Sequence, residues 1–388
     1  MNSVRWVWQR PSWPHLTFDA ARLAVPLARA RQESGALFGA AAAIGLGDRT
    51  ELEQEVWASE AVATAAIEGE SLDLAAVRSS VARRLGLATR GPGAPRNVEG
   101  LLDVMQDADD DWQSPLTAQR LCAWQATLFP GGTVLRNLLI GEFRSSPAPM
   151  QIISGPQGRE RVHYEAVPGP AVRAEMQVFI DWFNRNEPLD GVLRAGIAHV
   201  WFESIHPFED GNGRVGRALV DLALAQDLRH SSRLLGIAAA MRRRQDDYYD
   251  ALNVAQRGDG DVTAWLEWFL EIYVDACRSG RSGVHASIER ARFWATHRAV
   301  ALNEMQRRVL GKVLEAGPGQ FDGGLTARKY AAIAGTTRVT ASRHLMDLLE
   351  KGLIVRAEGP GGRSTRYDVA LPGWEWRPIE RRKNSAET

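Results

Sequence analysis

Hydrophobic residues recur at helical spacing through most of the first 280 residues. In Glu51–Glu68, for example, Leu52, Val56, Ala63 and Ile67 follow a series of three- and four-residue steps, which places them on one face of a helix. The same period predicts four further helices, over Ala171–Asn184, Leu193–Glu203, Ala218–Leu228 and Val262–Cys277. The pattern therefore predicts a mainly α-helical protein.

A different pattern interrupts the helices between Arg144 and Pro170. Gln151–Ile153 and Arg161–Tyr164 are short strand-like runs on either side of Ser154–Gly158, a segment of small residues, glycine and proline. Two such runs around a turn predict a small β-hairpin.

The C-terminal part of the chain has another rhythm. Three helices are expected, over Met305–Ala316, Ala327–Ala334 and Val339–Lys351, followed by two strands, Leu353–Val355 and Thr365–Val369, around a glycine-rich turn. This order of three helices and a hairpin predicts a winged helix-turn-helix.

Two stretches rich in small residues divide the chain. Thr89–Arg96 contains glycines and prolines that cannot continue a helix, and Arg278–Gly283 is composed of Arg, Ser and Gly, which predicts a flexible linker. We therefore expect three regions: an N-terminal helical region over residues 1–95, a central core over 96–280 and a C-terminal domain over 281–388.

Composition narrows the class of protein. The 388 residues carry 47 basic and 47 acidic side chains, but residues 281–388 hold 19 basic against 11 acidic ones, a net charge of +8 that favours an anionic partner. Cys122 and Cys277 are too few for a disulfide framework. The longest apolar stretch, Ala36–Leu46, is far too short to span a membrane, and no signal sequence opens the chain, so we expect a cytoplasmic protein without a membrane partner.

The segment His206–Arg217 concentrates the candidate chemistry. It reads HPFEDGNGRVGR and joins an apolar helix to a second helix, so its glycine-rich turn opens onto a helix N-terminus with free backbone N–H groups. Such an N-terminus binds phosphate, and Arg214 and Arg217 can add bidentate donors. Asp210 suits a bridging Mg²⁺, and His206 a general base. The alternative is a capped helix–loop–helix, in which these polar side chains only satisfy the local backbone.

His206–Arg217 matches each fixed position of the HPFxDGNGRxxR signature, and the chain thereby resembles the Fic-domain proteins. The resemblance extends to Gly141–Arg144, similar to the family's G-x-[FY]-R segment, and to Gln151–Val167, similar to its target-docking hairpin, the flap. Thr64–Gly69 is similar to the inhibitory motif [ST]xxxE[GN]. The fold that this implies is a Fic-type helical core with a β-hairpin flap, an N-terminal helical region and a C-terminal winged helix-turn-helix.

The resemblance implies an activity and a role for each motif residue. Most Fic proteins transfer AMP from ATP to a protein hydroxyl and release pyrophosphate. His206 would deprotonate the Ser, Thr or Tyr of the target protein, and Asp210 would hold Mg²⁺. The phosphates would be bound by Gly211, Asn212, Gly213, Arg214 and Arg217. Kinase-like members carry Lys where this chain has Gly213, which favours AMP transfer here.

A later helix is expected to line the adenine pocket. Tyr248, Tyr249, Leu252 and Gln256 match positions that do so in relatives, although Gln256 stands where Asn is usual. The alternative is an ordinary half-buried aromatic face of a helix. His199, on the apolar helix before the motif, is expected to be a core histidine, and His163 a surface or flap residue.

Thr64 and Glu68 lie four residues apart and therefore on one face of their helix. The resemblance implies that Glu68 pairs with Arg217, which then cannot hold the γ-phosphate, so that ATP binds unproductively. In some relatives the same Glu also supports removal of AMP. The alternative is a surface Glu at a helix C-terminus, capped by Gly69.

Two other functions remain open. One is a transcriptional regulator whose winged helix binds DNA through Arg338, Arg343, Arg363 and Arg366, with the Fic core as a nucleotide sensor; winged helices also bind proteins. The other is transfer of UMP or another phosphate-containing group by the same motif. Relatives often form dimers, so a homodimer is also expected. The sequence does not identify the target protein, the trigger that relieves inhibition or the balance between adding and removing AMP.

Overall fold

The computed structural model describes residues 5–89, 91–131, 138–154, 159, 161–185, 188–357 and 365–375 of the chain. The chain divides into two compact units, Met1–Arg281 and Ser282–Thr388. No helix among the described residues combines the length and the apolar character needed to cross a membrane.

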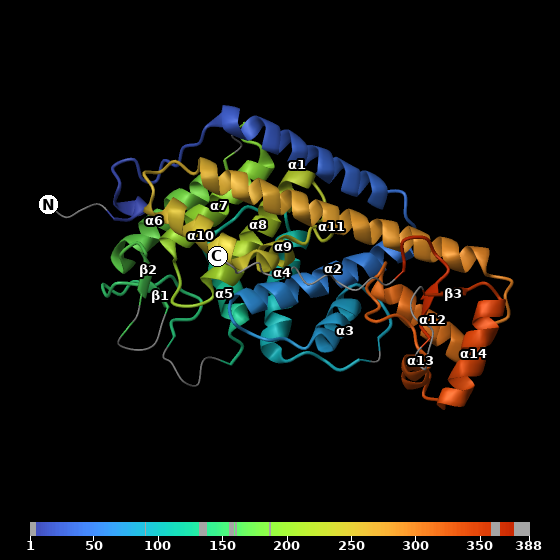
Figure 1. The fold of residues 1–388 in the computed structure, drawn as a ribbon. Helices are drawn as coiled ribbons and strands as arrows, with labels where there is room; N and C mark the ends of the chain where they lie inside the picture. Colours follow the sequence, from blue (N-terminus) through green and yellow to red (C-terminus); the bar gives the residue numbers. More distant parts are fainter. Residues whose placement is uncertain are drawn as a thin grey trace, which may run out of the picture. The chain divides into compact units, whose positions relative to one another are not determined.

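The first unit is built from helices and one small hairpin (Figure 1). Its elements are a 3₁₀ turn η1 (Val7–Gln9), α1 (Ala20–Ala41), α2 (Leu46–Ile67), α3 (Leu74–Arg84), α4 (Arg96–Asp110), α5 (Ala118–Leu128), β1 (Gln151–Ser154), β2 (Arg161–Glu165), α6 (Gly169–Phe183), α7 (Gly191–Ile205), α8 (Asn212–Leu228), α9 (Ile237–Arg243), α10 (Gln245–Arg257) and most of α11 (Thr263–Thr296). The mainly α-helical fold predicted from the hydrophobic pattern is confirmed.

The centre of this unit is α7. Each of its residues except Arg194 is buried, because the helix is apolar on all sides. The helices α6, α8 and α10 pack against it. The C-terminus of α7 therefore lies inside the unit, and the chain that leaves it, residues 206–211, starts from a rigid support.

The helix predicted over Glu51–Glu68 is α2, which begins five residues earlier, at Leu46, and is capped by Glu68. An acidic residue, Asp48, lies in its first turn, where the helix dipole favours a negative charge. From Trp57 onward α2 is buried on most sides, because α3, α4, α8 and α9 contact it. Its C-terminal turn is consequently held against the core.

The flexible linker predicted at Arg278–Gly283 is wrong. These residues continue α11, which lies side by side with α1 (Figure 1). A Cβ atom on Gly280 would come within 2.6 Å of the carbonyl oxygen of Leu234, so a close approach of backbones requires glycine there. Arg278 pairs with Glu33 of α1 at 2.8 Å. The small residues that resemble a linker in the sequence serve helix packing instead.

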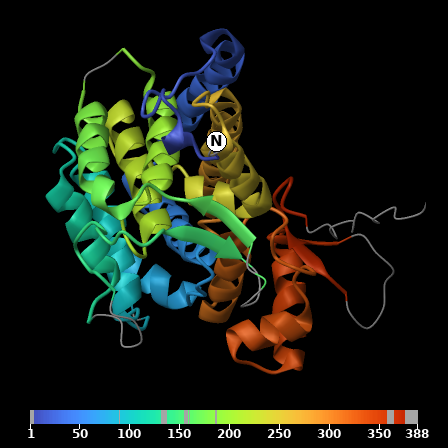
Figure 2. The same cartoon turned by 90° about the vertical axis from the view of Figure 1, so that its left-hand side faces the viewer.

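The hairpin predicted around Ser154–Gly158 is present as two antiparallel strands, β1 and β2, and most of its turn lies outside the described residues. It lies against α10 and the N-terminal segment (Figure 2). The ring of Trp6 meets Tyr164 edge-on at 5.3 Å, and the indole N–H of Trp8 donates to the carbonyl of Glu165 at 2.7 Å. The tryptophan-rich start of the chain therefore supports the base of the hairpin.

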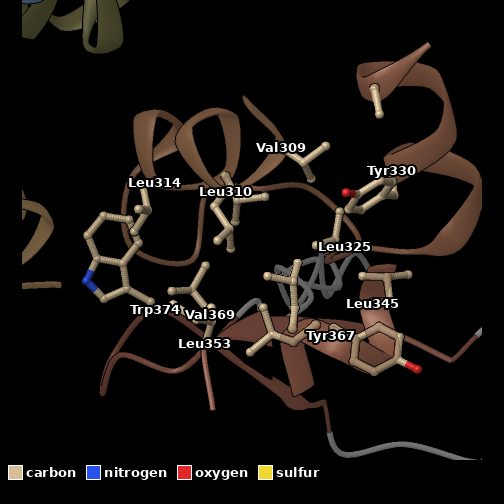
Figure 3. Close-up of a cluster of buried hydrophobic side chains, with 14 of the residues drawn as sticks. Val309, Leu310, Leu314, Leu325, Tyr330, Leu345, Leu353, Tyr367, Val369 and Trp374 are labelled. Atoms are coloured by element: carbon tan, nitrogen blue, oxygen red, sulfur yellow. The ribbon is translucent and has the colours of Figure 1, made fainter. Parts of the chain in front are cut away.

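The second unit has its own core (Figure 3). Its further elements are α12 (Glu304–Ala316), α13 (Ala327–Ala334), α14 (Arg338–Glu350), β3 (Ile354–Arg356) and β4 (Tyr367–Val369). The strands β3 and β4 are antiparallel, and a bridge joins Leu325 to Tyr367. The buried side chains come from all three helices and both strands. All five elements lie within two residues of the predicted ranges, while the glycine-rich turn at 359–363 lies outside the described residues.

Candidate active site

The loop that carries the candidate catalytic residues begins at the C-terminus of α7. His206 ends this helix in the left-handed conformation, with φ of 52°, and Gly211 precedes α8 with φ of 88°. Such angles suit glycine but are uncommon for histidine, so the surrounding structure must hold His206 in place. The two turns reverse the chain and bring the loop between them back onto the core.

Arg144 and Tyr164 hold the backbone at this point. The Nε atom of Arg144 donates to the carbonyl of His206 at 2.7 Å, and its Nη2 atom donates to that of Ile205 at 3.0 Å. The hydroxyl of Tyr164 donates to the carbonyl of Ser204 at 2.8 Å. The last carbonyls of a helix have no partner within it, so these bonds both satisfy them and fix His206. They give Gly141–Arg144 and the hairpin a physical role that their spacing in the sequence did not reveal.

Asn212 fixes the loop from its other end. Its side chain accepts from the backbone N–H of Phe208 at 2.9 Å and donates to the carbonyl of Phe208 at 2.8 Å. The amide of Gln125 also donates to the carbonyl of Asp210 at 3.3 Å. The side chain of Asn212 is therefore occupied inside the protein, and only its backbone N–H is available to a phosphate.

The N-terminus of α8 and two arginines form one anion cradle, which we define as the backbone N–H groups of residues 212–214 with the side chains of Arg214 and Arg217. N–H groups in the first turn of a helix find no acceptor within it, and the helix dipole makes this end positive. Both arginines are buried, at 7% and 4% exposure. The structure thus brings together the phosphate-binding residues predicted from the sequence.

Glu68 lies in this cradle. Its Oε1 atom is 2.8 Å from Nη2 of Arg217, and the hydroxyl and carbonyl of Thr64 also accept from this guanidinium. Burial alone would lower the pKa of Arg217, but the nearby Glu68 carboxylate raises it above its ordinary value. A Cβ on Gly213 would be 2.2 Å from Glu68 Oε1, so a side chain at this position would displace the carboxylate from its present place.

A second carboxylate, Glu70, was not predicted. Its Oε1 atom is 3.0 Å from Nη1 of Arg214, whose guanidinium also lies over the ring of Phe129. Both arginines of the cradle are therefore paired with acidic residues that directly follow α2. The presence of a second Glu, two residues after Glu68, is the only signal in the sequence that could have indicated the ion pair between Glu70 and Arg214.

Asp210 lies at the edge of the cradle with its side chain 44% exposed. Its Oδ1 atom accepts from the backbone N–H of Gly211 at 2.6 Å and is 3.5 Å from Nη2 of Arg214. A partly solvated carboxylate beside a phosphate-binding helix end fits Mg²⁺, which usually binds one or two carboxylates together with phosphates of the substrate.

The residues expected in an adenine pocket lie on α10. Tyr248 is buried and shares a hydrogen bond of 3.0 Å with Nε2 of His199. Tyr249 is 41% exposed, and its hydroxyl donates to the carbonyl of Ile67 at 3.0 Å. Gln256 is buried and donates to a backbone carbonyl of α7. All three side chains thus form hydrogen bonds within the protein, and their contact with adenine stays a prediction.

Leu252 lies on the same helix and is 9% exposed. His199 is fully buried in α7, as predicted for a core histidine, and its ring stacks on Trp265 at 5.8 Å. His163 lies on β2, in the hairpin, where it is half-buried.

Comparison with known proteins assigns the site to a family. Residues 115–224 match the model of the Fic/DOC family, and residues 6–87 match a domain of unknown function, DUF4172. The resemblance to Fic-domain proteins is therefore confirmed, and residues 115–224 form a Fic domain. These residues include β1, β2, α7 and α8 from Asn212 to Leu224, and so the loop from His206 to Arg217.

Curated relatives match part of the chain. The sequence is 34% identical over 83 residues to a probable protein adenylyltransferase of Aquifex aeolicus, covering 21% of this chain and 23% of the relative. It is 36% identical over 89 residues to the protein adenylyltransferase Fic of Nematostella vectensis, covering 22% and 19%. The matches thus span less than a quarter of either relative's length.

The fold is similar to a solved structure over most of its length. A Fic family protein from Desulfovibrio desulfuricans superposes with a TM-score of 0.52 at 24% identity, covering 92% of this chain and 98% of that one. At this level of identity the likeness concerns the fold alone.

Proposed function

We propose that this protein transfers AMP from ATP to a hydroxyl side chain of another protein. The observation that carries the proposal is the position of His206 and the anion cradle at the two ends of one loop, fixed by Arg144 on one side and Asn212 on the other. A base and a phosphate site held at a set separation can bring a hydroxyl and a phosphorus atom together. The relatives named protein adenylyltransferase support the choice of AMP.

In this reaction the hydroxyl oxygen of a Ser, Thr or Tyr side chain bonds to the α-phosphorus of ATP. The bond from that phosphorus to the oxygen that bridges it to the β-phosphorus breaks, and pyrophosphate leaves. His206 takes the hydroxyl proton. The N–H groups of residues 212–214 and the guanidinium groups of Arg214 and Arg217 stabilise the charge that develops on the phosphates.

Asp210 is the residue that would hold Mg²⁺. The metal ion, when bound, neutralises charge on the phosphates and orients them. Of the carboxylates near the cradle, Asp210 is the most exposed, and it belongs to the motif loop itself, whereas Glu68 and Glu70 follow α2. Its carboxylate is therefore the most accessible of these three to a bound metal ion.

We further propose that Glu68 inhibits the transfer. Its carboxylate pairs with the guanidinium of Arg217 and fills the space next to Gly213. A γ-phosphate would otherwise be bound at this place. Gly213 supports AMP transfer over kinase chemistry, because the kinase-like relatives carry Lys at this position. Removal of AMP from the modified target, by a water molecule that Glu68 orients and that releases AMP and the free hydroxyl, is a further activity to be tested.

Labelled ATP tests both proposals. Purified wild type, Glu68→Gly and Glu68→Gly/His206→Ala are incubated with Mg²⁺, a cell lysate and ATP labelled at either the α- or the γ-phosphate. We expect Glu68→Gly to transfer the α-label to protein at least tenfold faster than wild type, and the double variant to transfer none. Transfer of the γ-label would make the protein a kinase. If neither label is transferred but labelled UTP serves, the donor assignment is wrong.

A second candidate function is DNA binding by the C-terminal unit, supported by the exposed face of α14. Its described residues Arg338, Ser342 and Arg343 are exposed, whereas Leu345 and Leu348 of the same helix are buried. With β3 and β4 these helices have the order of a winged helix-turn-helix, which reads DNA with such a face. Loss of binding to genomic DNA fragments in Arg338→Ala/Arg343→Ala would support this function. Equal binding by the variant, or capture of a protein alone, would contradict it.

A further inference from the structure

Glu203 is a buried acidic residue that the proposed reaction has not used. It lies in the last turn of α7, with its side chain 7% exposed. Its Oε2 atom is 3.6 Å from Nδ1 of His206, three residues later. A buried carboxylate is costly unless it is paired, so its presence beside the histidine calls for a physical reason.

The position of His206 explains why the two side chains meet. Residues three apart on a helix face the same side, and the left-handed turn at His206 keeps its ring over the last turn of α7. Arg144 fixes the backbone of His206, and the imidazole is only 16% exposed. A shift of less than 1 Å would close the contact to a hydrogen bond, and such contacts often tighten when substrate binds.

The structure around Glu203 keeps the carboxylate charged and in place. A Cβ on Gly216 of α8 would be 2.6 Å from its Oε1 atom, so the two helices leave room for this carboxylate through a glycine. Burial would raise the pKa of Glu203, but His206, His199 and Arg217 together hold it below its ordinary value. Tyr248, Glu68 and Arg144 are further titratable groups near this cluster. Glu203 is thus ionised at neutral pH.

We propose that Glu203 is the positioning residue for His206. Its carboxylate accepts the hydrogen on Nδ1, which fixes the ring and leaves Nε2 unprotonated to take the proton of the attacking hydroxyl. Once Nε2 has taken that proton, the carboxylate stabilises the imidazolium, as the buried Asp does in Ser-His-Asp enzymes. The inference rests on the proposed function for the proton that Nε2 accepts, but the tautomer of His206 is a property of the protein alone.

The tautomer can be measured without any reaction. Long-range ¹H–¹⁵N spectra of protein labelled with ¹⁵N-histidine distinguish Nδ1–H from Nε2–H rings, and His206→Ala identifies the signal. We expect the Nδ1–H form in wild type and a change toward Nε2–H in Glu203→Gln. The control is Glu209→Gln, which removes an exposed carboxylate three residues after His206. An Nε2–H ring in wild type, or an unchanged tautomer in Glu203→Gln, would overturn the proposal.

Kinetics separate positioning from a purely structural role. In the Glu68→Gly background, Glu203→Gln is expected to lower kcat for transfer of the α-label by about 10- to 100-fold, with KM for ATP changed less than about twofold. Glu203→Asp keeps the charge and should recover part of the rate, which guards against a variant that folds poorly. A raised KM with unchanged kcat would mean that Glu203 acts through Arg217 instead. If Glu68→Gly itself transfers no label, the proposed function fails, and the tautomer still decides the role of Glu203.

Discussion

At the scale of single residues, the site is organised by pairs of opposite charge. Arg217 and Arg214 each have a carboxylate from the segment after α2, but the two pairs differ in exposure: Glu68 is 30% exposed and Glu70 40%, against guanidinium groups that are nearly buried. Glu68 also approaches Gly213, whereas Glu70 contacts only one arginine. We therefore expect Glu68 to block the anion cradle more strongly than Glu70 does.

Glu70→Gln tests this difference. Because a half-exposed ion pair is worth only about 0–1 kcal/mol, we expect the single variant to stay within about threefold of wild type in transfer of the α-label. In the Glu68→Gly background it should lower KM for ATP by up to about fivefold, and less so at high salt. Steady-state assays at two salt concentrations measure this.

Glu53→Gln serves as the control, because the carboxylate of Glu53, 14% exposed, pairs with Arg49 within α2 rather than with an arginine of the cradle. Strong activation by Glu70→Gln alone would show that Glu70, rather than Glu68, holds the site closed.

The residues of the motif were predictable because the chemistry of each is encoded locally. His206, Asp210, Arg214 and Arg217 follow one another in a single segment, and the N-terminus of α8 follows from its glycines. Glu203 and Glu70 were not predicted, since their roles depend on how α7, α8 and the segment after α2 approach one another. Asn212 was assigned to phosphate binding, but its side chain closes the loop onto Phe208.

At the scale of elements, the hydrophobic period located the helices. The error at Arg278–Gly283 arose because small residues occur both in linkers and in closely packed helices. Glycine and serine suggest a linker, and they also permit two helices to pack closely. In α11 the glycine serves packing: a Cβ on Gly280 would come within 2.6 Å of the carbonyl oxygen of Leu234, in the turn between α8 and α9, and within 3.1 Å of Leu37 in α1. Sequence pattern alone could not decide this, because the partner lies more than 40 residues away in the chain.

Gly280→Ala tests the packing of α11. The added methyl group has no space, so we expect a loss of about 1–3 kcal/mol in the free energy of unfolding. Gly39→Ala in α1 is the matched control, because a Cβ there meets no atom within 4 Å and alanine favours helix by up to about 1 kcal/mol. Urea unfolding of the full chain measures both. Equal effects of the two substitutions would mean that residue 280 is not tightly packed.

At the scale of the whole molecule, buried acids link stability to pH. Glu60 of α2 accepts hydrogen bonds from the backbone N–H groups of Ala238 and Ala239 at the start of α9, at 2.7 and 2.8 Å. Burial raises its pKa to about 7 despite these bonds. Burial, with Glu60 nearby, also raises the pKa of Asp221 in α8. The carboxyl groups thus make the packing of α2 on its neighbours sensitive to protonation.

A group whose pKa is raised by folding stabilises the protein when it is protonated, and this contribution is lost as pH rises through the folded pKa. For Glu60 the window runs from its ordinary value near 4.5 to about 7. Between pH 8 and pH 5.5 it should add about 2 kcal/mol to the free energy of unfolding.

Comparison of wild type with Glu60→Gln isolates this contribution, because all other titrating groups are present in both proteins. We expect the gain in stability between pH 8 and pH 5.5, measured by urea unfolding, to be smaller in the variant by about that amount. Identical pH dependence in both proteins would show that Glu60 is already ionised and well solvated in the folded state.

The attachment of Glu68 to the end of α2 has a consequence for how ATP concentration acts on the enzyme. The carboxylate reaches Arg217 without diffusing, because α2 is packed on four other helices, so its local concentration at the cradle is set by geometry and greatly exceeds that of a free solute. Ordinary changes in cellular ATP would then leave the occupant of Arg217 almost unchanged. Under the proposed inhibition, control of AMP transfer would pass from the supply of nucleotide to whatever moves the C-terminal end of α2.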